Sequence, residues 1–166
     1  MRSILVATML VSLCVAPSSA IAGYAAHRDA DDTENQIDFR VVRLAHRYEP
    51  NRAIVVIRRY ERRHPDYLRL QAYFDARGPA RADHRVDAIF DSGSSGWVIC
   101  AVRARGHGQI GDCSSLREHA RTIRIAFRWR LLNVNKPLRW RLTGEDWSTD
   151  DRPIVDRAPD FGFYTD

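Results

Sequence analysis

Strict alternation of apolar and polar residues recurs along this chain, and it constrains the fold more than any other feature. In residues 67–75 the apolar positions are Leu68, Leu70, Ala72 and Phe74. Residues 122–130 repeat the pattern, with apolar Ile123, Ile125, Phe127 and Trp129 separated by Arg124, Ala126 and Arg128. Because successive side chains of a strand point to opposite faces, each run predicts a strand with one buried face and one polar face.

The centre of the chain, residues 85–103, predicts two strands joined by a turn. The first strand alternates apolar residues with polar ones at Val86, Ala88 and Phe90, and the second has its apolar set at Trp97, Ile99 and Ala101. Residues 91–96 between them read Asp-Ser-Gly-Ser-Ser-Gly. Glycine permits positive φ in a turn, and Asp or Ser side chains bond to the local backbone. The stretch therefore predicts a hairpin of an antiparallel sheet.

Weaker patterns complete the expected fold. Residues 37–44 and 138–142 alternate, and the β-branched run 53–57 predicts a central strand that is apolar on both faces. Residues 106–111 are expected to form a flexible excursion, and residues 115–119 a helical turn. Short strands with no convincing long helix predict an all-β fold. We expect a two-layer antiparallel β-sandwich, immunoglobulin-like or jelly-roll-like, of about seven or more strands.

The first 22 residues resemble a secretory signal peptide. Arg2 precedes an apolar run from Ile4 to Val15, and Ala20-Ile21-Ala22 fits a cleavage site. The apolar run is shorter than the ~20 residues of a membrane span. We therefore expect a secreted, extracellular protein that is cleaved after Ala22 and has no membrane span in its mature chain. The other predicted segments are a flexible leader at 23–36, a β-sandwich domain at 37–143 and a polar, acidic C-terminal segment at 144–166.

Beyond the expected signal, the sequence has two cysteines, Cys100 and Cys113. An even number of cysteines outside the cytosol favours a disulfide. The chain has no C-x-x-C pair and its histidines lack ligand spacing, so the sequence predicts no metal site and no cofactor. The acidic C-terminal segment is expected to be solvated, with a stabilising calcium ion as the alternative.

Arginine supplies nearly all of the positive charge, and the net charge of +5 is modest. This balance lacks the dense basic cluster of a nucleic-acid binder, so no nucleic-acid partner is expected. If the apolar faces point inward, the outward positions present arginine and tyrosine. The candidate binding residues are Tyr67, Arg69, Tyr73, Arg124, Arg128, Arg139 and Arg141. Guanidinium groups bind carboxylates and phosphates, and tyrosine rings stack on sugars, so the expected partner is a cell-envelope glycan or another anionic polymer. A solvated face, with arginines paired to acids such as Asp87, is the alternative.

The tryptophans divide into two groups. Trp97, Trp129 and Trp140 lie in phase with aliphatic residues of their own strands, which predicts core packing. Trp147 lies outside the strand pattern, as does Tyr164, so these two are freer to contact a ligand.

Residues 88–95 read Ala-Ile-Phe-Asp-Ser-Gly-Ser-Ser, which resembles the catalytic loop of pepsin-like aspartic proteases. The resemblance implies that Asp91 is a catalytic carboxylate. Such chemistry needs two carboxylates sharing a proton, so a chain with one copy would act as a dimer. The alternative is a hairpin turn rich in Gly and Ser.

A broader resemblance rests on the order of the elements: the strand 67–75, the hairpin 86–102, the strand ending in Arg130-Leu-Leu-Asn133, residues 138–142, and the tail Asp156-Arg-Ala-Pro-Asp160. This order is similar to small secreted β-sandwich proteins of high-GC Gram-positive bacteria, and in layout to DOMON-like and family 9-like carbohydrate-binding domains. The resemblance implies a binding domain. We therefore expect a secreted, non-enzymatic binding module. The alternatives are a dimeric aspartic protease using Asp91 and a structural extracellular protein without a small ligand.

Overall fold

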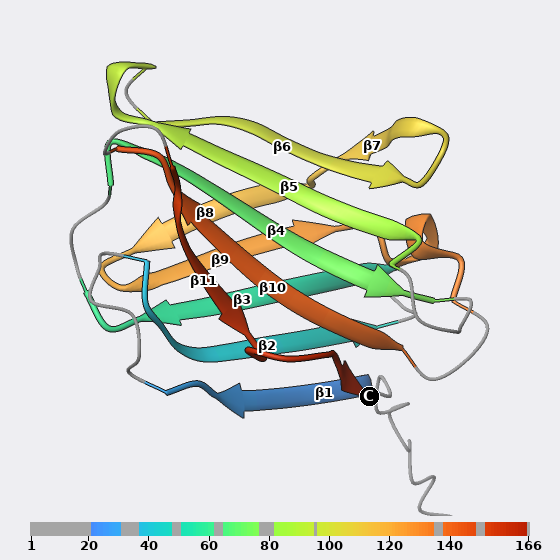
Figure 1. Ribbon diagram of the computed structural model, residues 1–166. Helices are drawn as coiled ribbons and strands as arrows, with labels where there is room; N and C mark the ends of the chain where they lie inside the picture. Colours follow the sequence, from blue (N-terminus) through green and yellow to red (C-terminus); the bar gives the residue numbers. More distant parts are fainter. Residues whose placement is uncertain are drawn as a thin grey trace, which may run out of the picture.

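The chain folds into two antiparallel sheets packed face to face (Figure 1). The computed structural model describes residues 21–30, 37–47, 51–61, 65–76, 82–94, 96–134, 138–148 and 152–165. The five-stranded sheet has the order β1 (Ile21–Arg28), β2 (Phe39–Arg47), β3 (Arg52–Arg59), β9 (Thr122–Phe127), β8 (Ser115–His119). The seven-stranded sheet has the order β11 (Ile154–Ala158), β10 (Arg139–Asp146), β4 (Tyr67–Asp75), β5 (His84–Asp91), β6 (Gly96–Ala104), β7 (Gly108–Asp112), and β12 (Tyr164–Thr165) pairs with β10. These two layers confirm the predicted all-β sandwich.

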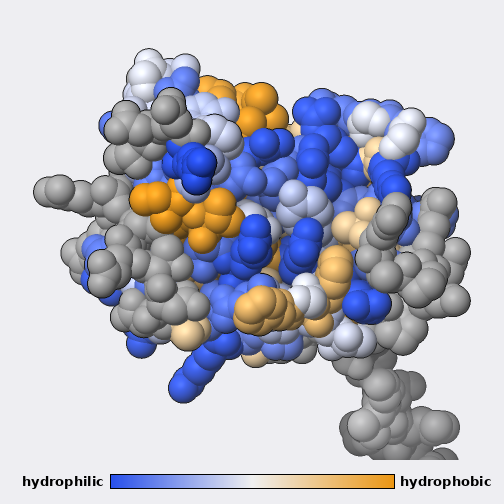
Figure 2. Space-filling model, in the orientation of Figure 1, coloured by the Kyte–Doolittle hydropathy of each residue, from blue (hydrophilic) through white to orange (hydrophobic). Residues whose placement is uncertain are grey.

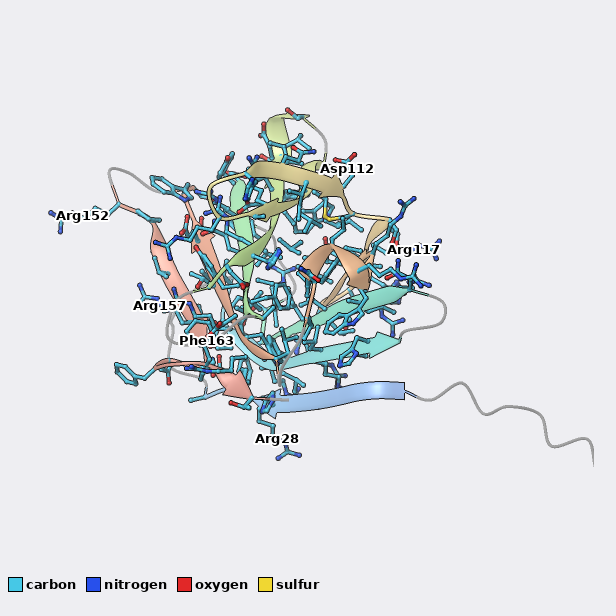
Figure 3. All side chains as sticks on the ribbon, turned by 90° about the vertical axis from the view of Figure 1, so that its right-hand side faces the viewer. Arg28, Asp112, Arg117, Arg152, Arg157 and Phe163 are labelled. Carbon is cyan, nitrogen blue, oxygen red and sulfur yellow. A yellow bond between two sulfur atoms is a disulfide. The ribbon has the colours of Figure 1, made fainter. Side chains whose placement is uncertain are left out.

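The core lies between the sheets, where side chains fill the space seen edge-on in Figure 3. The apolar set of β4 faces this core, with Leu68, Leu70 and Phe74 fully buried. Trp140 and Phe127 enter it from β10 and β9. Burying one large apolar side chain contributes about 1.5–3 kcal/mol, so the alternating strands are held by their inner faces. The sequence pattern thus predicted correctly which residues of these strands point inward.

Close approach of the sheets leaves no room for a side chain at Gly144. An added Cβ atom would lie 2.8 Å from the Phe39 ring, closer than real contacts allow. Gly144 lies in β10 on the inner face, and Phe39 comes from β2 of the other sheet. A glycine within a strand commonly marks such a contact.

The predicted hairpin is confirmed, but its second strand carries a bulge. Strands β5 and β6 pair around a short 3₁₀ helix, Ser92–Ser94. Phe90 pairs with Trp97 while Ile89 pairs with Ile99, so Val98 is the extra residue. Trp97 packs against the core, whereas Ile99 is 40 % exposed. The prediction that Ile99 shares the inner face of Trp97 is therefore wrong, because a bulge shifts the phase of alternation by one residue.

Several polar segments form strands that the sequence did not predict. Residues 23–28 of the expected flexible leader belong to β1, which pairs along β2. Residues 115–119, predicted as a helical turn, form β8, and the expected excursion at 106–111 contains most of β7. The C-terminal segment contributes β11 and β12. β1, β7, β8 and β11 lie at sheet edges, where pairing with an established strand supplies backbone hydrogen bonds without an apolar pattern.

The two sheets are linked by specific contacts as well as by the core. The predicted disulfide joins Cys100 of β6 to Cys113, where the chain leaves β7 for the other sheet. The Phe39 backbone N–H donates to the buried Asp156 carboxylate at 2.6 Å, which connects β2 to β11. Expected signal residues 1–20 lie outside the described residues. No helix in the described part of the chain has the length and apolar character that crossing a membrane requires.

Candidate functional site: the arginine face of the seven-stranded sheet

The structure separates the predicted binding residues into two groups on opposite sides of the molecule. Tyr67, Arg69, Tyr73, Arg139 and Arg141 alternate outward along β4 and β10 and share the outer surface of the seven-stranded sheet. Arg124 lies on β9 of the five-stranded sheet, and Arg128 follows that strand as the N-cap of the 3₁₀ helix Trp129–Leu132. Figure 3 shows the two sides, with Arg157 projecting on one and Arg117 on the other. The seven residues therefore do not form a single surface.

Two further arginines, Arg85 of β5 and Arg103 of β6, join the first group. The register places Arg141, Tyr73, Arg85 and Arg103 side by side in one row across four strands. At about 4.8 Å per strand the row spans roughly 15 Å. We call the outward arginines Arg69, Arg85, Arg103, Arg139 and Arg141 the arginine face. In Figure 2 the surface turned to the viewer is mainly hydrophilic, with apolar residues in separate patches.

Sequence reasoning missed Arg103 because of the bulge. In an unbroken alternation from Trp97, residue 103 would point inward; the extra residue at Val98 turns it outward with Ala101. Arg85 was in the outward phase of β5, so the alternation itself carried the signal for that residue.

The buried carboxylate of Asp87 forms ion pairs with three of these arginines. Its side chain is 3 % exposed, and its carboxylate lies 3.0 Å from Arg85 Nε and 2.9 Å from Arg103 Nε. Arg69 Nη2 lies 3.8 Å from the same carboxylate. Gln71 Nε2 donates to Asp87 at 2.8 Å, and Tyr73 Oη donates to Gln71 at 2.8 Å. The alternative prediction, that Asp87 pairs with outward arginines, is therefore correct for this part of the face.

The acid is covered while the guanidinium groups stay accessible. The side chains of Arg69, Arg85 and Arg103 keep 33 %, 35 % and 37 % of their surface exposed above Asp87. Both close contacts use Nε, which leaves the terminal Nη groups of Arg85 and Arg103 to bond to solvent or to a ligand. The outermost layer is thus positively charged although an acid lies beneath it. Paired guanidinium groups of this kind suit carboxylate, sulfate or phosphate oxygens.

Aromatic rings hold the arginines of β10. The Arg141 guanidinium carbon lies 4.9 Å from the centre of the Tyr73 ring and 5.2 Å from that of Phe163. Arg139 lies 5.1 Å from the Phe163 ring and 3.6 Å from buried Asp75. Cation–π contacts of this length restrict the side chains without neutralising their charge. The C-terminal segment therefore contributes to the face through Phe163.

A cavity of about 350 Å³ opens beside the arginine row, at the end of the sheet where β4 ends and β5 begins. Its lining includes Tyr73, His84, Arg85, Arg103 and Arg105. Asp83 also lines it, 2.8 Å from His84 Nδ1. Three guanidinium groups around a hollow of this size provide a place for an anionic group. At the opposite end of the sheet, Tyr67 and Arg69 line a groove with Trp147.

Asp91, the residue that the resemblance to a protease loop implies is catalytic, accepts hydrogen bonds within its own turn. Its carboxylate accepts a hydrogen bond from the Gly93 backbone N–H at 2.9 Å and another from Ser94 Oγ at 2.9 Å. Side-chain bonds to the backbone two residues on are typical of turns that begin with Asp. This arrangement agrees with the hairpin-turn alternative.

Two acidic residues of the C-terminal segment accept backbone hydrogen bonds within the protein. Asp146 accepts from the Ser148 N–H at 2.8 Å, and Asp156 accepts from Phe39. Within the described ranges, no group of three or more His, Cys, Asp or Glu residues is placed to hold a metal ion. Burial, together with Asp29, Asp160 and Asp156, raises the pKa of Tyr164 to about 12.

Comparison with known proteins found no relative of this chain. The chain matches no protein-family model, and no curated protein or solved structure shows significant similarity to it.

Proposed function

We propose that this protein is a secreted, non-enzymatic binding module that holds an anionic polymer, with cell-envelope polysaccharide as the leading ligand class. The arginine face is the binding surface. Its guanidinium groups contact the acidic substituents of the ligand, and Asp87 and Gln71 hold the arginines in position before binding.

The observation that carries the proposal is the direct opposition of Arg85 and Arg103 across β5 and β6. Like charges opposite each other on a sheet destabilise the pairing. Here both side chains are drawn to one buried carboxylate and remain about one-third exposed. Two positive groups held close together, with their terminal nitrogens accessible, favour an anion that bridges them.

The five-stranded sheet contains a second pair of arginines that can be compared with Arg85 and Arg103. Arg117 and Arg124 also lie directly opposite each other, on β8 and β9, and both are exposed. Among the described residues, no acid fixes this second pair. Arginines without such a partner lose side-chain entropy when they bind, which lowers the net gain from each contact. The second pair therefore provides a matched control with the same charge and the same strand geometry.

The test compares two double variants, Arg85→Gln/Arg103→Gln and Arg117→Gln/Arg124→Gln. Affinity for polygalacturonate, a carboxylated polysaccharide, is measured at about 50 mM and about 500 mM sodium chloride, because salt screens exposed charges. We expect the first variant to lose about tenfold or more in affinity, which corresponds to about 1.4 kcal/mol, and the second to stay close to wild type. Circular dichroism checks that both variants fold.

Equal losses in the two variants would refute a specific site and indicate general charge attraction. No binding of the wild type to any acidic polymer would instead favour the structural-protein alternative.

A further inference from the structure

A groove at the end of the arginine face opposite to the cavity has a different character. It has a volume of about 460 Å³, and the described residues that line it are Tyr67, Arg69 and Trp147. Tyr67 is 36 % exposed and Trp147 is 45 % exposed. Exposed aromatic side chains that border one hollow are typical of binding sites rather than of ordinary surface.

Trp147 differs from the other three tryptophans in having no ring partner among the described residues. Trp97 packs edge-on against Phe90 at 5.6 Å, Trp129 stacks on His46 at 3.9 Å, and Trp140 lies 5.1 Å from Tyr164. In the part of the chain that the structure describes, neither Tyr67 nor Trp147 has an aromatic ring or a guanidinium group against its face. Their ring faces are therefore available to a ligand.

Hydrogen bonds hold both residues in place. The Trp147 backbone N–H donates to the Tyr67 carbonyl at 3.0 Å, and the Tyr67 N–H donates to Ser148 Oγ at 3.1 Å. The Trp147 indole N–H donates to Glu145 at 3.2 Å, which brings the ring toward the outer surface of the sheet. Arg69 Nη1 lies 3.8 Å from the same Glu145 carboxylate. The groove thus combines two positioned rings with the Arg69 guanidinium, while Glu145 contacts both Trp147 and Arg69.

We infer that Tyr67 and Trp147 form a stacking subsite for a sugar ring, with Arg69 at the same groove to bond to its hydroxyl groups. A pyranose presents C–H groups on its face and hydroxyl groups at its rim, which matches flat apolar rings bordered by polar side chains. This inference rests on the proposed function and narrows its ligand to an acidic polysaccharide.

The spacing along β4 sets the form of that ligand. Tyr67 in the groove and Tyr73 in the arginine row are six residues apart on one strand, which corresponds to roughly 20 Å at about 3.3 Å per residue. A single sugar cannot span that distance, so a chain molecule is required to fill the groove and contact Arg85 and Arg103 together. The groove binds a sugar ring of the polymer, and the arginine row binds the acidic groups of the same polymer.

The experiment measures the affinity of three ligands for wild type, Trp147→Ala and Phe161→Ala. The ligands are polygalacturonate, fully methyl-esterified polygalacturonate and polyphosphate, a polyanion without sugar rings. Phe161 is 92 % exposed, so its variant removes an exposed aromatic ring without touching the groove. Acrylamide quenching of tryptophan fluorescence is measured with and without polygalacturonate. It reports whether the polymer shields Trp147, the most exposed described tryptophan, from the quencher.

We expect Trp147→Ala to weaken polygalacturonate binding by about fivefold or more and to leave polyphosphate binding unchanged, while Phe161→Ala matches wild type on all three ligands. Polygalacturonate should also protect the wild type from quenching. The methyl-esterified polymer should bind more weakly than the acid form, because it lacks charges for the arginine row.

Two results would overturn the inference while leaving the proposed function intact. One is an unchanged affinity of Trp147→Ala for polygalacturonate together with a loss in Arg85→Gln/Arg103→Gln. The other is binding of polyphosphate alone. Absence of binding to all three ligands would overturn both.

Discussion

Replacement of Asp87 by Asn tests whether this carboxylate organises the arginine face. The change keeps the shape of the side chain but removes its charge. It also places an amide N–H₂ group where the carboxylate accepts from Gln71 Nε2, at 2.8 Å, and lies within 3.0 Å of two arginine Nε atoms. One carboxylate acceptor is lost, and donors then face donors around a buried site.

The expected loss of stability depends on the burial of Asp87 and on the partial exposure of the arginines that it contacts. Losing a buried partner of a charged pair costs about 3–5 kcal/mol, and a hydrogen bond to a charged group contributes about 1.5–3 kcal/mol. Because Arg85 and Arg103 remain 35 % and 37 % exposed, they can turn toward water, which reduces the loss. We therefore expect Asp87→Asn to lower the free energy of unfolding by about 2–4 kcal/mol.

Thermal unfolding followed by circular dichroism at neutral pH is the assay. A loss of that size should lower Tm by roughly 6–12 °C in a domain of this length. Asp112→Asn is the control, because this exposed carboxylate accepts a single side-chain bond, from Gln109 at 2.6 Å. We expect the control to change the unfolding free energy by less than about 0.5 kcal/mol. An Asp87→Asn protein as stable as the control would show that Asp87 does not anchor the arginines.

Three further predictions concern the rest of the fold. Burial lowers the pKa of His46, so the unfolded chain binds more protons below about pH 6.5, and the stabilisation contributed by neutral His46 is lost as the pH falls below that value. His46→Phe, which preserves an aromatic ring over Trp129, should show a smaller drop in urea-unfolding free energy between pH 7.5 and pH 5 than wild type does; an equal drop would assign the effect to other groups. Cys100→Ser/Cys113→Ser should lower the unfolding free energy by about 3 kcal/mol, because the bridge closes a short loop in the unfolded chain, and a chain equally stable with and without reductant would contradict this value. Asp91→Asn should cost about 1 kcal/mol through its two exposed turn bonds and leave polymer binding unchanged, whereas acid-pH proteolysis present in wild type and absent in Asp91→Asn would support the protease alternative.

Alternation along single strands was readable from the sequence because it depends on local geometry alone. Leu68, Leu70 and Phe74 point inward in β4, as a period of two requires. The same logic identified Trp140 as a core residue, and local turn chemistry identified the hairpin at 91–96. Trp129 is buried as predicted, but the predicted strand 122–130 ends at Phe127 and Trp129 begins a 3₁₀ helix. The even number of cysteines identified the disulfide. Each of these features needs only residues that are near one another in the chain or that have a single available partner.

The pairing of strands was decided by the tertiary structure. Arg69 and Arg124 carry the same outward signal on their own strands, yet they lie on different sheets, because a strand pattern does not state which layer the strand joins. Edge strands such as β1 and β8 lack an apolar period, and their partners supply the hydrogen bonds that form them.

The set of residues in the candidate site depended on both the sequence pattern and the tertiary structure. The sequence determined that β4, β5 and β10 each present polar side chains outward, including Arg69, Arg85 and Arg141. Only the register brought Arg141, Tyr73, Arg85 and Arg103 into one row, and only the bulge at Val98 turned Arg103 outward. The physical reason is that side-chain direction is set by backbone geometry within a strand, whereas neighbours across a sheet are set by contacts between residues distant in sequence.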